Sequence, residues 1–238
     1  MRPYSTVLIL SSIFFVSNSL SNTVMAQQRV PSPKEPQAAQ QTVDPETAQR
    51  RLIEGNRRFV QNRPMHPHAS AQRRLTIGLS GQHPFAIVLS CADSRVPPEN
   101  VFDAGLGDLF VVRVAGHIVD DAVIGSIEYA SQHLGARLLV VLGHEKCGAV
   151  QAAIDNLREA HLRYLVEAIQ PAVAKVRNEV PAADPRGLAD RAIAANVFEA
   201  MSELESSEPV LRQLVARKQL KIIGAVYDLE TGKVEFVR

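Results

Sequence analysis

Two kinds of hydrophobic pattern follow one another along the chain. Leu52, Ile53, Phe59 and Val60 recur at the spacing of an amphipathic helix. Residues 138–142 are five apolar residues in a row, which is typical of a strand buried on both faces. Together these patterns predict helices at about 45–62, 69–80, 122–134, 147–158, 161–178, 185–205 and 208–217, and strands at 85–90, 109–114, 138–142, 220–227 and 233–237.

The alternation of strands with helices predicts an α/β fold. Four parallel strands should form a central, mainly parallel β-sheet that is covered by helices. A turn at Thr231 and Gly232 joins the last two strands, so the C-terminal strand should be an antiparallel edge strand. Ligands of such sheets bind beyond the carboxyl ends of the strands, and functional residues are therefore expected there.

The first 26 residues have the three parts of a secretory signal. Arg2 gives a positive start, an apolar run covers 7–16, and Ala26 ends a stretch that suits cleavage. The alternative is a membrane anchor, but a span needs about 20 apolar residues and this run is roughly half as long. We therefore expect export to the periplasm or the extracellular space, and no membrane span in the mature chain.

Between the expected signal and the folded part lies a segment with no apolar period. Residues 27–43 are rich in Gln, Pro, Ala and Ser, which is typical of a flexible linker. Asp44 stands before Pro45, where it can cap the first helix. The sequence thus predicts one folded domain over residues 44–238.

The composition is that of a globular protein with a buried core. Of the 238 residues, 46% are hydrophobic and 21% are charged, and the formal net charge is +1. There is no basic block and no tryptophan, so neither charge nor base stacking favours a nucleic-acid partner. The two cysteines could form one disulfide, which composition alone leaves open.

Three potential metal ligands follow two of the predicted strands. Cys91 comes directly after strand 85–90, His144 follows strand 138–142, and Cys147 stands at the start of the next helix. Neighbouring parallel strands would deliver all three side chains to the same edge of the sheet. Two sulfurs and one nitrogen suit Zn²⁺, and three protein ligands leave a fourth position open, as in catalytic zinc sites.

Each of these residues, taken singly, also fits a role without metal. A buried cysteine is often a small hydrophobic residue, and a histidine after a strand is often a hydrogen-bonded core residue. In an exported protein, a disulfide between Cys91 and Cys147 is a further alternative. The motifs Cys-Ala-Asp-Ser-Arg and Gly-His-Glu-Lys-Cys-Gly-Ala, each at a strand end, favour the metal site.

These paired motifs resemble the β-carbonic anhydrase family, over about residue 45 to the end of the chain. The resemblance implies the β-carbonic anhydrase fold and one Zn²⁺ per subunit, held by Cys91, His144 and Cys147. It implies that zinc-bound hydroxide hydrates CO₂ reversibly to bicarbonate and a proton. Asp93 and Arg95 would form a catalytic pair, and Asp93 could close the fourth metal position as a ligand at lower pH.

Further positions match the plant-like branch of the family. Gln82, Phe110 and Tyr129 occupy the positions that line the substrate pocket there, although each could also be an ordinary loop or core residue. Another branch uses a tryptophan to hold regulatory bicarbonate, which this chain lacks. His117 lies close to the expected site. A histidine there could carry protons to and from the site, but we interpret His117 as a loop residue without that role.

The resemblance also implies assembly. Members of the family dimerise through swapped N-terminal helices, so a homodimer or a dimer of dimers is expected, with Tyr129 at a pocket on the subunit boundary. The apolar face of the helix at 45–62 fits this arrangement, but it fits packing on its own domain equally well.

Three rival functions stay open from the sequence. The same site could hydrolyse carbonyl sulfide or carbon disulfide, or the chain could be a non-catalytic zinc- or bicarbonate-binding protein. The third rival is an exported, disulfide-bonded domain without metal. The expected partners are therefore the small molecules CO₂ and bicarbonate, with no nucleic acid.

Overall fold

The computed structural model describes residues 42–179 and 185–237. The expected signal at 1–26 and all but the end of the expected linker at 27–43 lie outside the described residues. Within the described part of the chain, no helix is both long enough and apolar enough to cross a membrane.

The predicted helices and strands are all present, with small changes in their ends. The helices are α1 (Pro45–Val60), α2 (Ala71–Ser80), α3 (Pro98–Val101), α4 (Asp121–His133), α5 (Gly148–Ile154), α6 (Leu162–Glu179), α7 (Pro185–Ser206) and α8 (Leu211–Ala216), with one 3₁₀ turn, η1 (Ala115–His117). The strands are β1 (Ala86–Ser90), β2 (Leu109–Arg113), β3 (Leu138–His144), β4 (Lys221–Tyr227) and β5 (Val234–Val237).

Three details differ from the sequence prediction. The strand β3 continues through Gly143 to His144, so the histidine is the last residue of the strand and does not follow it. The helix α5 ends at Ile154, four residues before the predicted end at 158. The short elements α3 and η1 were not predicted, because three or four residues are too few to show a hydrophobic period.

The predicted sheet of four parallel strands with an antiparallel edge strand is confirmed. The strand order is β2-β1-β3-β4-β5, in which the first four strands are parallel and β5 is antiparallel to β4. In the registers of β1 with its two neighbours, Ser90 pairs with Arg113 of β2 and with Leu142 of β3. The ends of β1 and β3 therefore lie side by side, which places the residues after them at one edge of the sheet.

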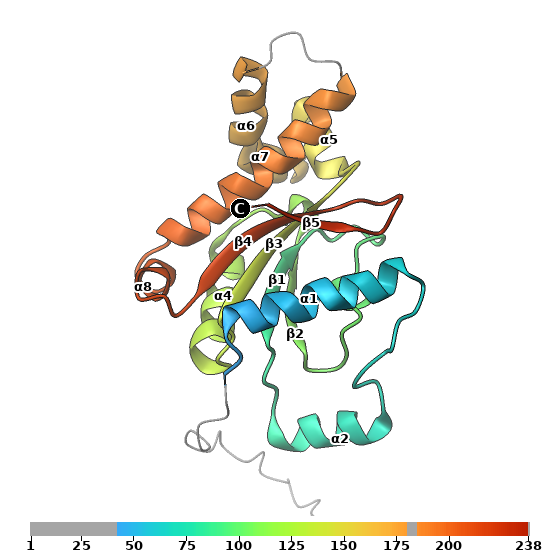
Figure 1. The fold of residues 1–238 in the computed structure, drawn as a ribbon. Helices are drawn as coiled ribbons and strands as arrows, with labels where there is room; N and C mark the ends of the chain where they lie inside the picture. The colour runs from blue at the N-terminus through green and yellow to red at the C-terminus, as the bar shows by residue number, and fades with distance from the viewer. Residues whose placement is uncertain (1–41, 180–184, 238) are drawn as a thin grey trace, which may run out of the picture. The chain divides into compact units, whose positions relative to one another are not determined.

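Side chains of each central strand alternate between two apolar layers. Ile87 and Leu89 of β1 face the layer formed with α4, α7 and α8, whereas Val88 faces the layer that contains α1 and α3. Figure 1 shows α1 crossing one face of the sheet, with α4 beyond the opposite face. This two-sided cover explains why β1 and β3 are fully buried and why both are apolar up to their last residues, Ser90 and His144.

The first helix packs on the sheet of its own chain. Asp44 caps α1 by accepting a hydrogen bond from the Thr47 backbone N–H at 2.8 Å, as its position before Pro45 predicts. Ala48 and Leu52 are fully buried against the layer that contains Val88. The apolar face of α1 therefore packs on the sheet of its own chain.

A third apolar cluster lies at the carboxyl ends of the parallel strands. It combines Cys91 and Cys147 with residues of α5, α6 and α7, among them Val150, Ile169 and Ile193. In Figure 1 these three helices stand together beyond the ends of β1 and β3. Both cysteines are thus removed from solvent by helices that follow them in the chain.

Candidate metal centre

Three potential ligand atoms meet where β1 and β3 end. The Sγ atoms of Cys91 and Cys147 and one ring nitrogen of His144 all lie within 4.8 Å of one another, and all three residues are buried. Both cysteines are free, with no disulfide between them. The structure therefore brings together the three ligands that the sequence predicts.

The ring of His144 is oriented by the backbone. Its Nδ1 lies 2.8 Å from the carbonyl oxygen of Glu145, and because a carbonyl can only accept, Nδ1 carries the hydrogen and donates it. The Nε2 atom then has a free lone pair, is buried, and has no hydrogen-bond partner among the described residues. Buried polar atoms rarely stay unpaired, and a metal ion bound at Nε2 would satisfy this one.

The pKa values of the two neighbouring thiols shift in opposite directions. A hydrogen bond with Cys147 and, against the effect of burial, the neighbouring His144 ring and the Gly116 N–H lower the pKa of Cys91 to about 3. The same bond with Cys91, together with burial, raises the pKa of Cys147. The surroundings of Cys91 thus favour its thiolate form, and a divalent cation would stabilise both sulfurs as thiolates.

Asp93 and Arg95 form a two-pronged ion pair beside the three ligands. The Arg95 Nε donates to Asp93 Oδ1 at 2.9 Å and its Nη2 donates to Oδ2 at 2.7 Å, and the backbone N–H of Arg95 also donates to Oδ1. These bonds with Arg95 hold the pKa of Asp93 well below its usual range, although burial opposes them. The Oδ2 atom lies 3.9 Å from Nε2 of His144, so an ionised carboxylate borders the candidate metal position.

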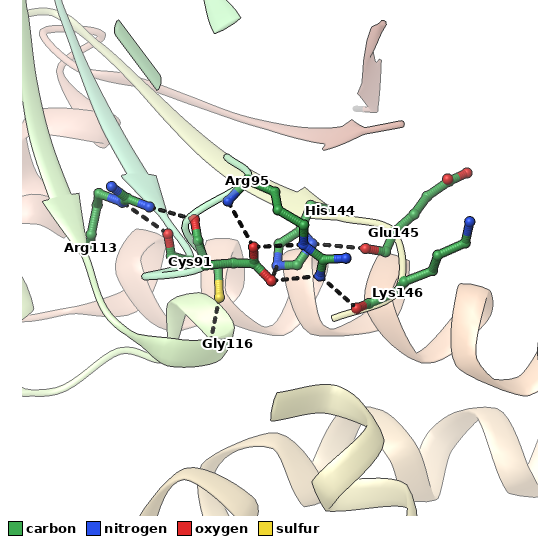
Figure 2. Close-up of polar contacts among 8 residues, drawn as sticks. Cys91, Arg95, Arg113, Gly116, His144, Glu145 and Lys146 are labelled. Carbon is green, nitrogen blue, oxygen red and sulfur yellow. Dashed lines mark hydrogen bonds and ion pairs between the residues drawn. The ribbon is translucent and has the colours of Figure 1, made fainter. Parts of the chain in front are cut away.

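Two further contacts to Cys91 are visible only in the structure. Arg113, at the end of β2, donates from Nε to the carbonyl oxygen of Cys91 at 3.0 Å and from Nη2 to that of Asp93 at 2.6 Å. The backbone N–H of Gly116 donates to Cys91 Sγ at 3.3 Å. Figure 2 shows both contacts reaching Cys91, with His144 beside it.

The strand pairing could have indicated the contact from Arg113 but not the contact from Gly116. An arginine that ends a strand parallel to the one before Cys91 lies opposite Ser90, within reach of the Cys91 backbone. Almost every residue has a backbone N–H, so the sequence does not indicate which one donates a hydrogen bond to a sulfur. The two contacts fix the loop that carries Cys91 and Asp93.

Comparison with known proteins agrees with this geometry. A model of the carbonic anhydrase family matches residues 86–234, which is more than half of the chain. Carbonic anhydrase 2 of Mycobacterium tuberculosis is 40% identical over 195 residues, which cover 80% of this chain and 91% of that protein. The chain belongs to the β-carbonic anhydrase family.

Two more members of the family show similar coverage. A carbonic anhydrase of Mycolicibacterium smegmatis is 40% identical over 199 residues, covering 81% of this chain and 93% of that protein. The solved structure of the β-carbonic anhydrase CcaA superposes with a TM-score of 0.64 at 28% identity, covering 79% of this chain and 91% of that chain. The fold inferred from the sequence is therefore confirmed as the β-carbonic anhydrase fold.

The three residues expected to line the substrate pocket lie away from the ligand atoms in this chain. Phe110 pairs with Ile87, four residues before Cys91, which corresponds to about 13 Å along a strand. Its ring lies 6.3 Å from that of Tyr129, centroid to centroid, and Tyr129 is half exposed. Gln82 is exposed in the loop before β1. The structure thus brings the rings of Phe110 and Tyr129 together, but it places none of the three residues beside the candidate metal ligands of the same chain.

His117 is a buried residue of the turn that follows β2. It is fully buried, and burial lowers its pKa to about 4, so its ring is neutral at neutral pH. Its Nε2 lies 3.0 Å from the Asn196 amide nitrogen on α7. Full burial and a neutral ring agree with our interpretation that His117 is no proton shuttle, but the residue is part of a packed network and not of a free loop.

A hollow of about 690 Å³ borders the Cys147 side of the centre. Its wall carries four acidic residues from three parts of the chain, Glu145, Asp190, Asp228 and Glu230. Burial and the charges of Asp228 and Asp190 raise the pKa of Glu145. The negative charge on this side favours a cation at the neighbouring ligand cluster.

Thiol titration separates the metal site from the disulfide that the sequence left open. In purified protein loaded with zinc, we expect neither thiol to react under native conditions, because a metal-bound, buried thiolate is protected. After a chelator and denaturant are added without reductant, both thiols should react. Two reactive thiols before chelation would contradict the site, and none after it would indicate a disulfide.

Proposed function

We propose that this chain is a zinc-dependent carbonic anhydrase that catalyses the reversible hydration of CO₂ to bicarbonate and a proton. The observation that carries the proposal is the buried, unpartnered Nε2 of His144 beside two free sulfurs, with the ionised Asp93 at their border. The relatives at 40% identity are themselves named carbonic anhydrase.

The ligand set supports zinc. Two thiolates and one imidazole are the soft and borderline donors that Zn²⁺ prefers, and three protein ligands leave its fourth position for a reactant. Cys91, His144 and Cys147 would hold the ion. Zn²⁺ supplies Lewis acidity, which lowers the pKa of water at the open position to near neutrality; a carbonic anhydrase is itself the standard example of this effect.

Asp93 is suited to orient the reacting water. As an ionised carboxylate it can only accept hydrogen bonds, so it would accept one from the reacting water and thereby orient an oxygen lone pair toward the carbon of CO₂. Arg95 keeps Asp93 ionised and in place through its two side-chain bonds. The Nη2 of Arg95 also donates to the carbonyl of Lys146 at 3.3 Å, which links the Cys91 loop to the Cys147 loop.

With Asp93 held by Arg95, the fourth metal position is free for substrate. An arrangement in which Asp93 itself becomes the fourth ligand requires both side-chain bonds to Arg95 to break. The low pKa of Asp93 means that the carboxylate stays ionised and paired with Arg95 near neutral pH. We propose that the paired arrangement is the working one.

We further propose that a second copy of the chain completes the pocket with Gln82, Phe110 and Tyr129. The helix α2 has no buried residue, and its Leu75 and Leu79 are exposed, as is the Tyr129 side chain on α4. Exposed apolar groups of this kind favour association. In a homodimer or a dimer of dimers, the partner's copies of these residues would line the substrate pocket beside Cys91, His144 and Cys147.

We propose export with removal of residues 1–26, which rests on the N-terminal pattern of charge and hydropathy alone. Native mass spectrometry of protein produced with its complete N-terminus in a secreting bacterial host tests both export and assembly. We expect two or four times the mass of a chain that begins at Gln27. A monomer would contradict the assembly, and a chain that keeps residues 1–26 would contradict the export.

Replacing the Asp93 carboxylate tests the catalytic assignment. Asp93→Asn keeps the shape of the side chain but puts a donor where only an acceptor serves, so we expect kcat/KM for CO₂ hydration to fall about 100-fold. The measurement is stopped-flow CO₂ hydration over a range of pH, at equal zinc content. Unchanged rate and pH dependence in Asp93→Asn would contradict the role.

A matched control removes another carboxylate near the site. Glu230→Gln makes the same chemical change in an exposed residue that pairs with Lys146, and we expect activity close to that of the unmodified chain. Carbonyl sulfide is offered in parallel. Hydrolysis of carbonyl sulfide without hydration of CO₂ would show that carbonyl sulfide, and not CO₂, is the substrate. Metal binding without either activity would indicate a non-catalytic protein.

A further inference from the structure

The turn η1 is shaped so that a backbone N–H reaches the sulfur of Cys91. Gly116 lies in the left-handed region with φ +69°, and its N–H donates to Cys91 Sγ at 3.3 Å. A Cβ at this position would lie 2.6 Å from Ile169 Cδ1 and 3.1 Å from Ala149 Cβ. Backbone conformation and lack of space therefore both require glycine here.

A side chain from a distant helix holds this turn. Asn196 of α7 is buried, and its Nδ2 donates to the carbonyl oxygen of Gly116 at 2.9 Å. The same nitrogen lies 3.0 Å from Nε2 of His117. Because the Gly116 carbonyl can only accept, the amide nitrogen must face the turn, so its second hydrogen is available to His117 Nε2. One amide thus bonds two consecutive residues of the turn, about 80 positions earlier in the chain.

The same stretch of α7 contacts the other ligand strand. A Cβ at Gly143, the residue before His144, would lie 2.7 Å from Val197 Cγ2 and 3.5 Å from both Ile193 Cγ2 and His117 Cε1. The helix is therefore packed closely against the end of β3 while Asn196 bonds the turn after β2. The distance between the Gly116 N–H and the Cys91 sulfur depends on this packing.

A hydrogen bond to a thiolate ligand reduces the electron density that the sulfur donates to its metal. The N–H withdraws electron density from the sulfur, so the sulfur donates less charge and the metal remains a stronger Lewis acid. Two thiolates would otherwise make zinc a weaker acid than three imidazoles do. The bond from Gly116 opposes this effect at Cys91.

We propose that Asn196 is a positioning residue of the metal centre, which holds the Gly116–His117 turn so that the Gly116 N–H stays bonded to the Cys91 sulfur. The inference rests on the proposed function, because it assigns Asn196 a part in tuning the same metal. Asn196 itself touches neither metal ligand nor substrate; it acts through the backbone of the turn. Without its two bonds, the turn would keep only the bond from the His117 N–H to the Val114 carbonyl and its packing, and Gly116 could adopt other backbone conformations.

The test is Asn196→Leu, which has a similar size but no donor, in protein loaded with Co²⁺ in place of Zn²⁺. We expect the sulfur-to-cobalt charge-transfer absorption to move to longer wavelength, because a sulfur without its hydrogen bond gives up an electron more easily. In the zinc form, we expect about 10-fold weaker metal affinity and a higher pH midpoint for CO₂ hydration. Asn196→Gln, which keeps an amide donor, should restore part of each change.

A matched control separates positioning from general loss of stability. Met201→Ala removes a buried side chain of the same helix that packs near Gly224, away from the turn. It should lower the melting temperature and leave the cobalt spectrum unchanged. Equal spectra for Asn196→Leu and the unmodified chain, or the same shift in Met201→Ala, would overturn the proposal.

A smaller replacement keeps the test decisive if Asn196→Leu does not fold. Asn196→Ser retains one donor and leaves room at the helix interface, and its spectrum should shift in the same direction by a smaller amount; an unshifted spectrum would overturn the proposal. The spectrum and the metal affinity are read without substrate. A chain with normal metal binding and no CO₂ hydration would therefore contradict the proposed function while the spectra still decide the role of Asn196.

Discussion

The site depends on the parallel pairing of β1 with β3. In this register Ser90 lies beside Leu142, so the residues that follow each strand emerge at the same edge of the sheet. Cys91 and His144 are brought together by backbone hydrogen bonds between two fully buried strands, not by attraction between the ligands themselves. A shift of one residue would turn every side chain to the opposite face, so that the residues of β1 would pack into the wrong apolar layer.

Around this pair, backbone groups determine what each ligand can do. The Glu145 carbonyl takes the hydrogen of His144 Nδ1 and leaves Nε2 as the ligand atom, while the Gly116 N–H bonds the Cys91 sulfur. Arg113 ties the Cys91–Asp93 loop to β2, and Arg95 ties Asp93 to the loop of Cys147. These contacts order the candidate ligands without a metal, so that metal binding would cost less conformational entropy.

The hydrophobic period and the alternation of strands with helices sufficed to predict a mainly parallel sheet, and the motifs at strand ends predicted the meeting of the three candidate ligands. The apolar run at 138–142 marked a buried strand, and two motifs at strand ends placed Cys91, His144 and Cys147 at one edge. The position of Cys147 at the start of a helix was also predicted correctly, since α5 begins at Gly148.

The remaining features could not be predicted, for physical reasons. Gly116 and Asn196 act through backbone atoms across gaps of 25 and 80 residues, and such bonds impose no periodicity on the sequence. The extension of β3 to His144 depends on pairing with Tyr227 of β4, which is a property of the sheet and not of Gly143. The pocket residues Gln82, Phe110 and Tyr129 show the same limit, because their proposed use depends on a partner chain.

Zinc K-edge X-ray absorption of the purified protein tests the central claim most directly. Two sulfurs at about 2.3 Å, one imidazole nitrogen at about 2.0 Å and one further light atom are predicted for an ion held by Cys91, His144 and Cys147. A spectrum with only nitrogen and oxygen neighbours, or with four sulfurs, would contradict the account. So would purified protein that binds no zinc.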